Sequence, residues 1–307
     1  MTAALIVVSL AFAWSMGAHY TGAVMGMPFA IRALSERWAL VLIAVFCMLG
    51  ATFASEPVQR TVGLHIVAAS GVTLLMALIM VIGALVLTTI YTYYKIPTST
   101  IQILVFCVVG TAIAAGAPVT WTTVGKLAIT WVLAPIAAML LGYAGTKLLQ
   151  RRSSPPWALV AVGIAASFVL GANDVANAVG VWEMVHVGNP VLAGFAGGAA
   201  MAIGALTWGR RILERVAFEI VDVDRPTATA AQGVQAVVVI AAVTQGFFTS
   251  INQALVGAMS GAAIANRREI NRRNLSGIVK GWLISPVSGF VFCFAAYRIA
   301  LALGYAG

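Results

Sequence analysis

Ten apolar segments follow one another along almost the whole chain, and they restrict the fold more than any other feature. They lie near residues 2–30, 38–55, 66–94, 97–117, 121–146, 157–182, 190–208, 230–247, 249–265 and 275–304. Only 9% of the residues are charged, against about 25% in soluble domains, so we expect an all-α polytopic membrane protein. Several segments are shorter than the roughly 20 residues of a straight spanning helix, which predicts interrupted or re-entrant helices.

The two halves of the chain repeat each other. A shift of 154 residues places GAHYTGAVMG of residues 17–26 on GANDVANAVG of residues 171–180. A shift of 151 residues then places Thr98–Ser99 on Thr249–Ser250, Trp131 on Trp282 and Pro135 on Pro286. We therefore predict two repeats, residues 1–150 and 151–307, joined by a short basic linker.

Five segments per repeat is an odd number, so two copies in one chain must have opposite orientations in the membrane. Inverted repeats of this kind are common in secondary transporters, which hold their substrate near the bilayer midplane where the repeats meet. The sequence therefore predicts a central site between the repeats, at interrupted helices.

Lys and Arg lie mostly in alternate connections between the segments. The odd-numbered connections hold nearly all of them, including a cluster at residues 267–273, whereas the even-numbered connections hold only Arg60 and Lys126. Cytoplasmic loops of membrane proteins are rich in Lys and Arg, so we expect the odd connections in the cytoplasm and both termini outside. The net charge of +9 is then mainly a topology signal.

Asp174 is the only one of the nine acidic residues that lies deep inside an apolar segment. A charge at that depth costs at least about 2.5 kcal/mol and usually marks a transport site or a proton relay. Asn173 and Asn177 are four positions apart, on one face of a helix, with Asp174 one position round. The sequence predicts that the three polar side chains converge on one polar ligand.

A second polar cluster occurs once in each repeat, as PTSTIQ at residues 97–102 and TSINQ at residues 249–253. Serine and threonine just before a helix are ordinary N-caps, which explains any one of them. A helix that begins in mid-membrane also presents free backbone amides and the positive end of its dipole, which favour an anion. We call these two clusters the first tip and the second tip, and we expect them to help bind an oxyanion.

Three other features have plain explanations. The N-terminal apolar stretch lacks the basic n-region of a signal peptide, so we expect it to be the first span. Cys47, Cys107 and Cys293 lie far apart in apolar runs, which favours core packing over disulfides or a metal site. His19 is typical of a packed or interfacial histidine, although its place opposite Asn173 also makes it a candidate proton carrier.

The motifs resemble those of the inorganic phosphate transporter (PiT) family. The resemblance covers nearly the whole chain and rests on GANDVANA and on a Ser/Thr tip followed by a Trp-x-x-x-Pro segment. It implies an ion-coupled permease for a tetrahedral inorganic anion, with a central site made by both repeats. Matched residue by residue, the substrate-binding set is Asn173, Asp174, Asn177, Thr98, Ser99, Thr100, Thr249 and Ser250.

The chain departs from the family pattern in two ways. Its first motif has His19, Tyr20 and Ala23 at the positions of Asn173, Asp174 and Asn177, and its tips end in Gln102 and Gln253 where the family commonly has histidine. The lost carboxylate is a hard oxygen ligand of the kind that small cations prefer. We therefore expect H⁺ rather than Na⁺ as the coupling ion, with Asp174 and His19 as the candidate carriers.

A degenerate first motif also resembles the sulfate permeases of the family. Phosphate near neutral pH carries a proton that the carboxylate of Asp174 can accept, whereas sulfate is an acceptor only and a carboxylate repels it. Tyr20 at the matching position weakens this preference. We expect phosphate as the substrate, with sulfate as the alternative.

Other functional classes fit less well. An anion channel would need a continuous polar lining, whereas the sequence has two compact polar clusters. An enzyme would need an acid–base or metal constellation, and one Asp and one His in the apolar runs do not make one. We expect no cofactor, no nucleic acid, and a multi-pass protein of the cell membrane whose partners are phosphate or sulfate and the lipid bilayer; a homodimer stays open.

Overall fold

The computed structural model describes residues 1–68, 71–94, 96, 98–150, 154–219, 224–268 and 272–305, without the side chains of residues 214–219 and 272–274. Over these ranges the regular secondary structure is helical, and one isolated bridge joins Val67 and Val119. Eight of the described helices are long and apolar enough to cross a membrane. The expected all-α polytopic fold is therefore confirmed.

The helices of the two halves follow the same order. The first half contains α1 (Thr2–His19), α2 (Thr21–Ala30), α3 (Glu36–Ala54), the short α4 (Glu56–Arg60), the π-helical turn η1 (Thr61–His65), α5 (Leu74–Tyr94), α6 (Thr100–Ala115) and α7 (Trp121–Leu149). The second half contains α8 (Pro156–Val179), α9 (Val181–Met184), α10 (Pro190–Glu219), α11 (Arg225–Thr244), α12 (Ile251–Ala265) and α13 (Arg272–Ala302). The pairs α1–α2 and α8–α9, α3 and α10, α5 and α11, α6 and α12, and α7 and α13 correspond.

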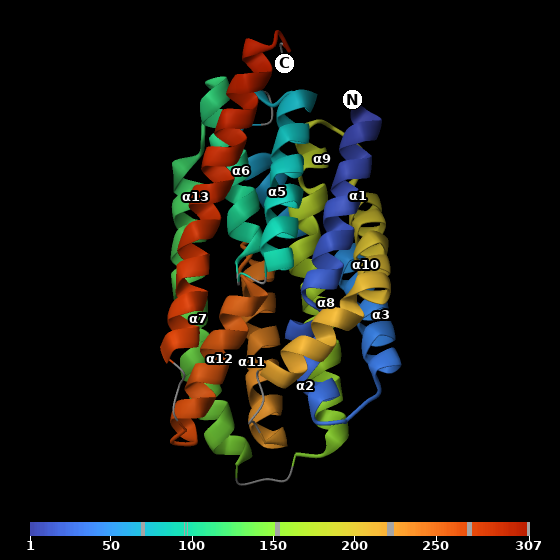
Figure 1. Cartoon of the computed structure of the whole chain (residues 1–307), viewed down its shortest axis with the longest axis vertical. Helices are drawn as coiled ribbons and strands as arrows, with labels where there is room; N and C mark the ends of the chain where they lie inside the picture. Colours follow the sequence, from blue (N-terminus) through green and yellow to red (C-terminus); the bar gives the residue numbers. More distant parts are fainter. Residues whose placement is uncertain are drawn as a thin grey trace.

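The two halves run in opposite directions (Figure 1). α1 descends from the end of the molecule that carries both termini, whereas α8 ascends from the other end. α6 lies in the upper half and α12 in the lower half, and both are too short to span the bilayer. The prediction of inverted repeats with re-entrant helices is confirmed. The division after residue 150 falls in the connection between α7 and α8 and stays a prediction.

Helices α1, α3, α6 and α7 each pack against a helix of the other repeat that corresponds to a different helix of their own repeat; we call this pattern the exchange. α1 contacts α10 and α3 contacts α8, while α6 contacts α13 and α7 contacts α12. Two bundles result: the motif bundle contains α1–α3 and α8–α10, and the tip bundle contains α5–α7 and α11–α13. α5 packs on α1 and α11 packs on α8 where the bundles meet.

Glycines allow this exchange, since a Cβ at these positions would overlap the backbone of the facing helix. The matched close approaches are Gly17 to Met201 and Gly171 to Cys47, Gly50 to Phe168 and Gly204 to Trp14, and Gly110 to Phe290 and Gly261 to Met139. These pairs follow the shifts of 154 and 151 residues that relate the repeats in the sequence. Small residues let membrane helices approach closely, so the internal symmetry extends from the motifs to the packing.

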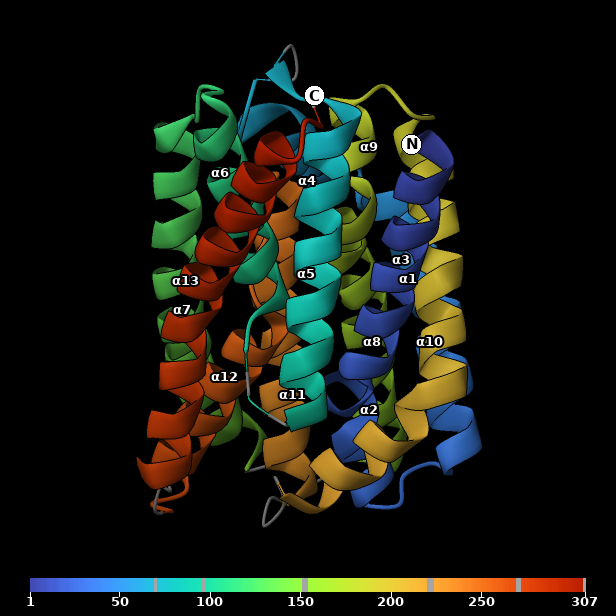
Figure 2. The same ribbon diagram turned by 45° about the horizontal axis from the view of Figure 1, so that its top comes forward.

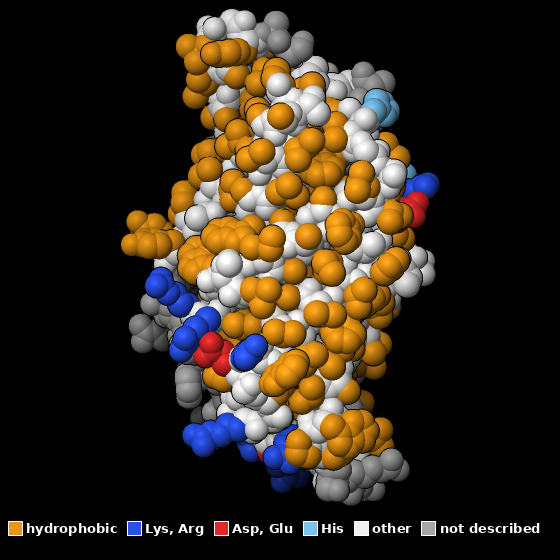
Figure 3. Space-filling view, turned by 90° about the vertical axis from the view of Figure 1, so that its right-hand side faces the viewer, with side chains coloured by type: hydrophobic (Ala, Val, Ile, Leu, Met, Phe, Trp, Pro, Cys, Tyr) orange, Lys and Arg blue, Asp and Glu red, His pale blue; other side chains and the backbone are white. Residues whose placement is uncertain are grey.

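The outside of the molecule matches a lipid environment. Hydrophobic side chains cover much of the face in Figure 3, and Lys and Arg gather toward its lower end. The turned view in Figure 2 places α4 at the same end as both termini. Among the basic residues used for the topology prediction, Lys95, Arg151 and Arg152 lie outside the described residues.

One expected segment begins later than the sequence predicted. The apolar run near 66–94 becomes helical only at Leu74. The hydroxyl of Thr73 accepts a hydrogen bond from the backbone N–H of Met76 at 3.3 Å, as an N-cap does. Apolar composition alone does not show where such a helix starts.

Candidate functional site

The two motif helices are interrupted at different places. In the first repeat the break lies at Tyr20, between α1 and α2. In the second repeat α8 continues through Asp174 and Asn177 and ends at Val179, so the break follows the motif at Gly180. The expected interruptions are present, but only the second motif is one continuous helix.

Asn173 joins the carboxylate of the second motif to the second tip. Its amide Nδ2 donates to Asp174 Oδ2 at 2.9 Å and to the carbonyl of Thr249 at 2.8 Å. Its Oδ1 accepts from the backbone N–H of Thr249 at 3.2 Å. All three residues are fully buried, so this amide holds the second tip against α8 inside the protein.

Tyr20 plays the corresponding part in the first repeat. Its hydroxyl is hydrogen-bonded to the hydroxyl of Thr100 at 2.6 Å, and it also lies beside the carboxylate of Asp174. A buried polar chain therefore runs from Thr100 through Tyr20, Asp174 and Asn173 to Thr249. This chain connects both repeats and crosses between the motif bundle and the tip bundle. From the sequence, Tyr20 is only the position where a carboxylate is lost, and the sequence does not predict its hydrogen bond to Thr100.

Both tip serines act as N-caps. Ser99 Oγ accepts from the backbone N–H of Gln102, and Ser250 Oγ accepts from that of Gln253, each at 3.4 Å. A serine hydroxyl that accepts one hydrogen bond can still donate its own hydrogen. The capping interpretation is confirmed, and it leaves both hydroxyls able to donate to an anion.

Each tip is also held by the long helix of the opposite repeat. The backbone N–H of Ser99 donates to Ser285 Oγ on α13 at 3.1 Å. The indole N–H of Trp131 on α7 donates to the carbonyl of Phe248, next to the second tip, at 3.0 Å. The tips are thus fixed parts of the tip bundle.

Several buried oxygen atoms in this region have no hydrogen-bond partner among the described residues. In the second motif and the tips they are Asp174 Oδ1, Asn177 Oδ1, Thr98 Oγ1, Thr249 Oγ1, Gln102 Oε1 and Gln253 Oε1, and Gln232 Oε1 and Gln235 Oε1 on α11 join them. Buried polar atoms are nearly always hydrogen-bonded, and an unpaired one costs about 1–3 kcal/mol. The second motif and both tips, which the sequence singled out, therefore supply polar atoms suited to a polar ligand.

Two predicted residues stand apart from the polar chain. The amide of Asn177 points to the sulfur of Met16 at 4.0 Å, so Asn177 does not converge on Asn173. His19 Nδ1 is hydrogen-bonded to Thr92 Oγ1 on α5 at 2.8 Å, and its ring lies edge-on to Tyr20. A packed histidine explains these contacts.

Gln232 and Gln235 on α11 are site residues that the sequence reasoning missed. Gln232 donates to the carbonyls of Ala23 at 3.2 Å and Val24 at 2.5 Å, and Gln235 donates to those of Ala23 and Ile251 at 3.3 Å each. Two glutamines three positions apart in an apolar segment were the available signal. They fill the space around α2 at Ala23, where the first motif has lost its second asparagine.

No group of three or more His, Cys, Asp and Glu side chains able to hold a metal occurs within the described part of the chain. The carboxylate of Asp174 instead lies beside the amide of Asn173 and the phenol of Tyr20. These groups donate or accept hydrogen bonds, so the chemistry of the site is hydrogen bonding to a polar ligand together with one titratable carboxylate.

Known proteins resemble the chain over its whole length. The model of the Phosphate transporter family matches residues 16–156 and again residues 153–293, once for each repeat. A "Probable low-affinity inorganic phosphate transporter" of Mycobacterium tuberculosis is 28% identical, over 98% of this chain and 78% of the relative. The "Sulfate permease CysP" of Bacillus subtilis is also 28% identical, over 99% of this chain and 90% of the relative.

A solved structure titled "The sodium-dependent phosphate transporter" superposes with a TM-score of 0.89 at 21% identity, covering 99% of this chain and 100% of that chain. This likeness supports the fold. The matched relatives are transporters and not enzymes. Because the family model accounts for both repeats and most of the sequence, the chain belongs to the phosphate transporter family.

Proposed function

We propose that the protein carries inorganic phosphate across the cell membrane as a proton-coupled secondary transporter that works by alternating access. The observation that carries this proposal is the buried polar chain from Thr100 to Thr249, which connects the two bundles at the middle of the molecule. Its ends are the tips of two helices that begin there.

The tips supply the anion-binding groups in this proposal. The N-termini of α6 and α12 present backbone N–H groups and positive dipole ends, and the hydroxyls of Thr98, Thr249 and the two capping serines lie with them. Asp174 accepts the proton that phosphate still carries near neutral pH. A tetrahedral oxyanion is thus held by neutral donors and one acceptor, without a buried arginine.

Alternating access follows from the two bundles. The bonds of Tyr20 to Thr100 and of Asn173 to Thr249 both cross from the motif bundle to the tip bundle. If one bundle rocks against the other, these are the contacts that change on the two sides of the site. Rocking of one part of an inverted-repeat transporter against the other is the common mechanism of this class.

Proton coupling is assigned to Asp174, with His19 as the second candidate. One oxygen of Asp174 accepts from Asn173 and the other is unpaired, whereas the hydrogen bond of His19 Nδ1 goes to Thr92, which is not part of the polar chain. Uptake of labelled phosphate into proteoliposomes should follow an inward proton gradient, persist when sodium is replaced by choline, and stop with a protonophore. Uptake that follows a sodium gradient at fixed pH contradicts proton coupling.

Sulfate is the second candidate substrate. The relative named a sulfate permease is as similar to this chain as the mycobacterial phosphate transporter, and the match covers more of the relative's length. Competition between labelled phosphate and unlabelled sulfate separates the two. Inhibition by phosphate at lower concentration than by sulfate is expected, and the reverse order would make sulfate the substrate.

The orientation in the membrane is also part of the proposal. The basic connections at the lower end of Figure 1 face the cytoplasm, and both termini face outward. A cysteine at Arg268 should be shielded from an impermeant thiol reagent added to intact cells, whereas a cysteine at Asn189 should react. The native cysteines are buried. The opposite labelling pattern would reverse the orientation.

A further inference from the structure

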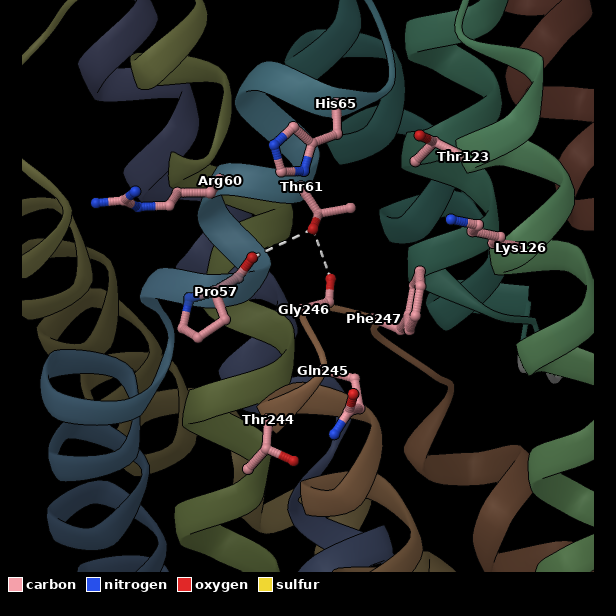
Figure 4. Close-up of a pocket in the computed structure, with 10 residues that line it drawn as sticks. All are labelled: Pro57, Arg60, Thr61, His65, Thr123, Lys126, Thr244, Gln245, Gly246 and Phe247. Atoms are coloured by element: carbon pink, nitrogen blue, oxygen red, sulfur yellow. Dashed lines mark hydrogen bonds between the residues drawn. The ribbon is translucent and has the colours of Figure 1, made fainter.

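A cavity of about 410 Å³ opens at the end of the molecule that carries both termini, outside the central site. Its walls come from α4, η1, the start of α7 and the connection between α11 and α12 (Figure 4). The polar side chains that line it are Arg60, Thr61, His65, Thr123, Lys126, Thr244 and Gln245. A water molecule occupies about 30 Å³, so an anion fits here with part of its hydration shell.

The lining contains basic side chains and no carboxylate. Arg60 is paired with Glu56 at 2.7 Å, and Figure 4 shows it pointing away from the other labelled side chains. His65 and Lys126 instead lie on either side of Gly246 and Phe247 (Figure 4). The positive charge that faces the cavity therefore belongs to Lys126, and His65 adds a ring N–H donor.

Membrane topology does not explain these charges. The Lys and Arg that set orientation belong to the opposite end, and this end carries only Arg60, Lys126 and Arg298. Arg60 and Lys126 both line the one cavity. Basic side chains gathered at a concave site attract anions and raise their local concentration.

The floor of the cavity is the segment that leads into the second tip. Gly246 and Phe247 line the cavity, the next residue Phe248 is fully buried, and Thr249 follows. Thr61 Oγ1 donates to the carbonyl of Gly246 at 2.6 Å and so holds this segment against η1. This short connection therefore links the lining of the cavity to Thr249 of the buried polar chain.

We propose that this cavity is a second oxyanion site at the mouth of the transport pathway, which binds free phosphate or sulfate before the connection between α11 and α12 moves aside. The Lys126 ammonium, the His65 ring N–H, the Thr123 hydroxyl and the Gln245 amide are the donors. This inference rests on the proposed function, because it assumes that the anion reaches the central site from this end.

The kinetic test compares two lysines on the same helix. Lys126 and Lys147 are both exposed on α7, at opposite ends. Lys126→Gln should raise the KM for external phosphate in proteoliposomes by about threefold at low salt with kcat unchanged, since one charge near a mouth contributes part of a steering effect of roughly 10-fold or more. In 1 M salt the difference should vanish, because the screening length falls to about 3 Å. Lys147→Gln should behave as the wild type.

A binding test needs no transport. A cysteine introduced at Thr123, which is half-buried in the lining, should react with an anionic thiol reagent. Inorganic phosphate should slow this labelling, and Lys126→Gln should remove the protection. The same protection in phosphatidylcholine and in anionic lipid identifies free phosphate as the occupant. Protection that depends on anionic lipid would assign the cavity to a lipid headgroup and overturn the proposal.

The two proposals fail in different ways. Wild-type protein that takes up neither phosphate nor sulfate contradicts the proposed function. Normal wild-type uptake with an unchanged KM in Lys126→Gln and no phosphate protection at Thr123→Cys contradicts only the second site. An equal rise of the KM in Lys147→Gln would show a general surface-charge effect and also overturn the second site.

Discussion

The two halves of the central site have the same helix packing but different side chains. Both repeats keep the glycines that let α1 approach α10 and α8 approach α3. The second repeat places a carboxylate and an amide on a continuous helix, whereas the first repeat has a break at Tyr20 and a phenol in place of the carboxylate. The close helix packing is thus present in both copies, whereas the carboxylate is present in only one.

The first repeat has not simply lost polar groups. The space near Ala23 is occupied by the amides of Gln232 and Gln235, which come from the other repeat and bond to α2 carbonyls. The shift of 151 residues places Val81 and Ala84 of α5 opposite these glutamines, so the second motif has no such filling. Asp174 Oδ1 and Asn177 Oδ1 of the second motif have no hydrogen-bond partner among the described residues, and neither do Gln232 Oε1 and Gln235 Oε1 beside the first motif. Because Asp174 supplies the carboxylate among these groups, we expect the titratable ligand chemistry on the side of the second motif.

The largest effect is expected for Asp174→Asn. Loss of a charged hydrogen-bonding partner worth about 3 kcal/mol corresponds to a fall of roughly a hundredfold in phosphate uptake. Membrane insertion should not change, and Glu36→Gln, at the lower end of α3, serves as the matched control. Uptake and the amount of protein in the membrane are measured together. Full activity would show that the charge of the second motif is not needed.

Asn173→Ala should follow. It removes the bonds to Asp174 and to both backbone groups of Thr249, and one buried unpaired group alone costs about 1–3 kcal/mol, so uptake should fall roughly 10-fold or more. Asn189→Ala, at the surface cap of α10, is the control. Wild-type uptake by Asn173→Ala would mean that the second tip does not depend on α8.

Gln235→Leu tests whether the amides from α11 stabilise the first motif. The variant leaves carbonyls of α2 and α12 without this donor, and we expect a loss of about 1–3 kcal/mol in the free energy of unfolding. Thermal unfolding in detergent measures it, with the exposed Gln150→Leu as the control. A melting temperature equal to that of the wild type would show that Gln235 is dispensable for packing.

Tyr20→Phe removes one hydroxyl and leaves the ring in place. The lost bond to Thr100 is worth about 0.5–1.5 kcal/mol, which predicts a fall in kcat/KM of about 2–10-fold. Thr100→Val and the double variant complete a cycle that isolates the pair. Additive effects of the two substitutions would contradict a direct coupling through this bond.

The smallest effect is expected for His19→Gln. Glutamine can keep a bond to Thr92 of about 1 kcal/mol, so uptake should change by no more than about twofold, with the pH profile retained. Measured pH profiles of both His19→Gln and Asp174→Asn decide the carrier. A pH profile of uptake that is flattened by His19→Gln and not by Asp174→Asn would assign the transported proton to His19 instead of Asp174.

Much of the architecture was readable before the structure. The repeat shifts, the odd number of segments and the lone buried carboxylate predicted inverted repeats around a polar centre, and the serines before α6 and α12 were recognised as caps. These features are local in the sequence, since hydrophobicity, helix spacing and capping depend on neighbouring residues. The topology expected from the charges is likewise a property of short connections.

The contacts at the centre were not readable in this way. The sequence around Asn173 does not indicate that its amide donates a hydrogen bond to the carbonyl of Thr249. The sequence around Gln232 likewise does not indicate that its amide donates to the carbonyl of Ala23 in the other repeat. Such hydrogen bonds depend on which helices pack against each other at the glycines, and this choice of helix pairs is set by packing over the whole molecule. The sequence alone determined a membrane protein of two inverted halves with one buried carboxylate. The tertiary structure alone decided that Tyr20, Asn173 and two distant glutamines connect those halves, because long-range hydrogen bonds form only where packing places donor and acceptor about 3 Å apart.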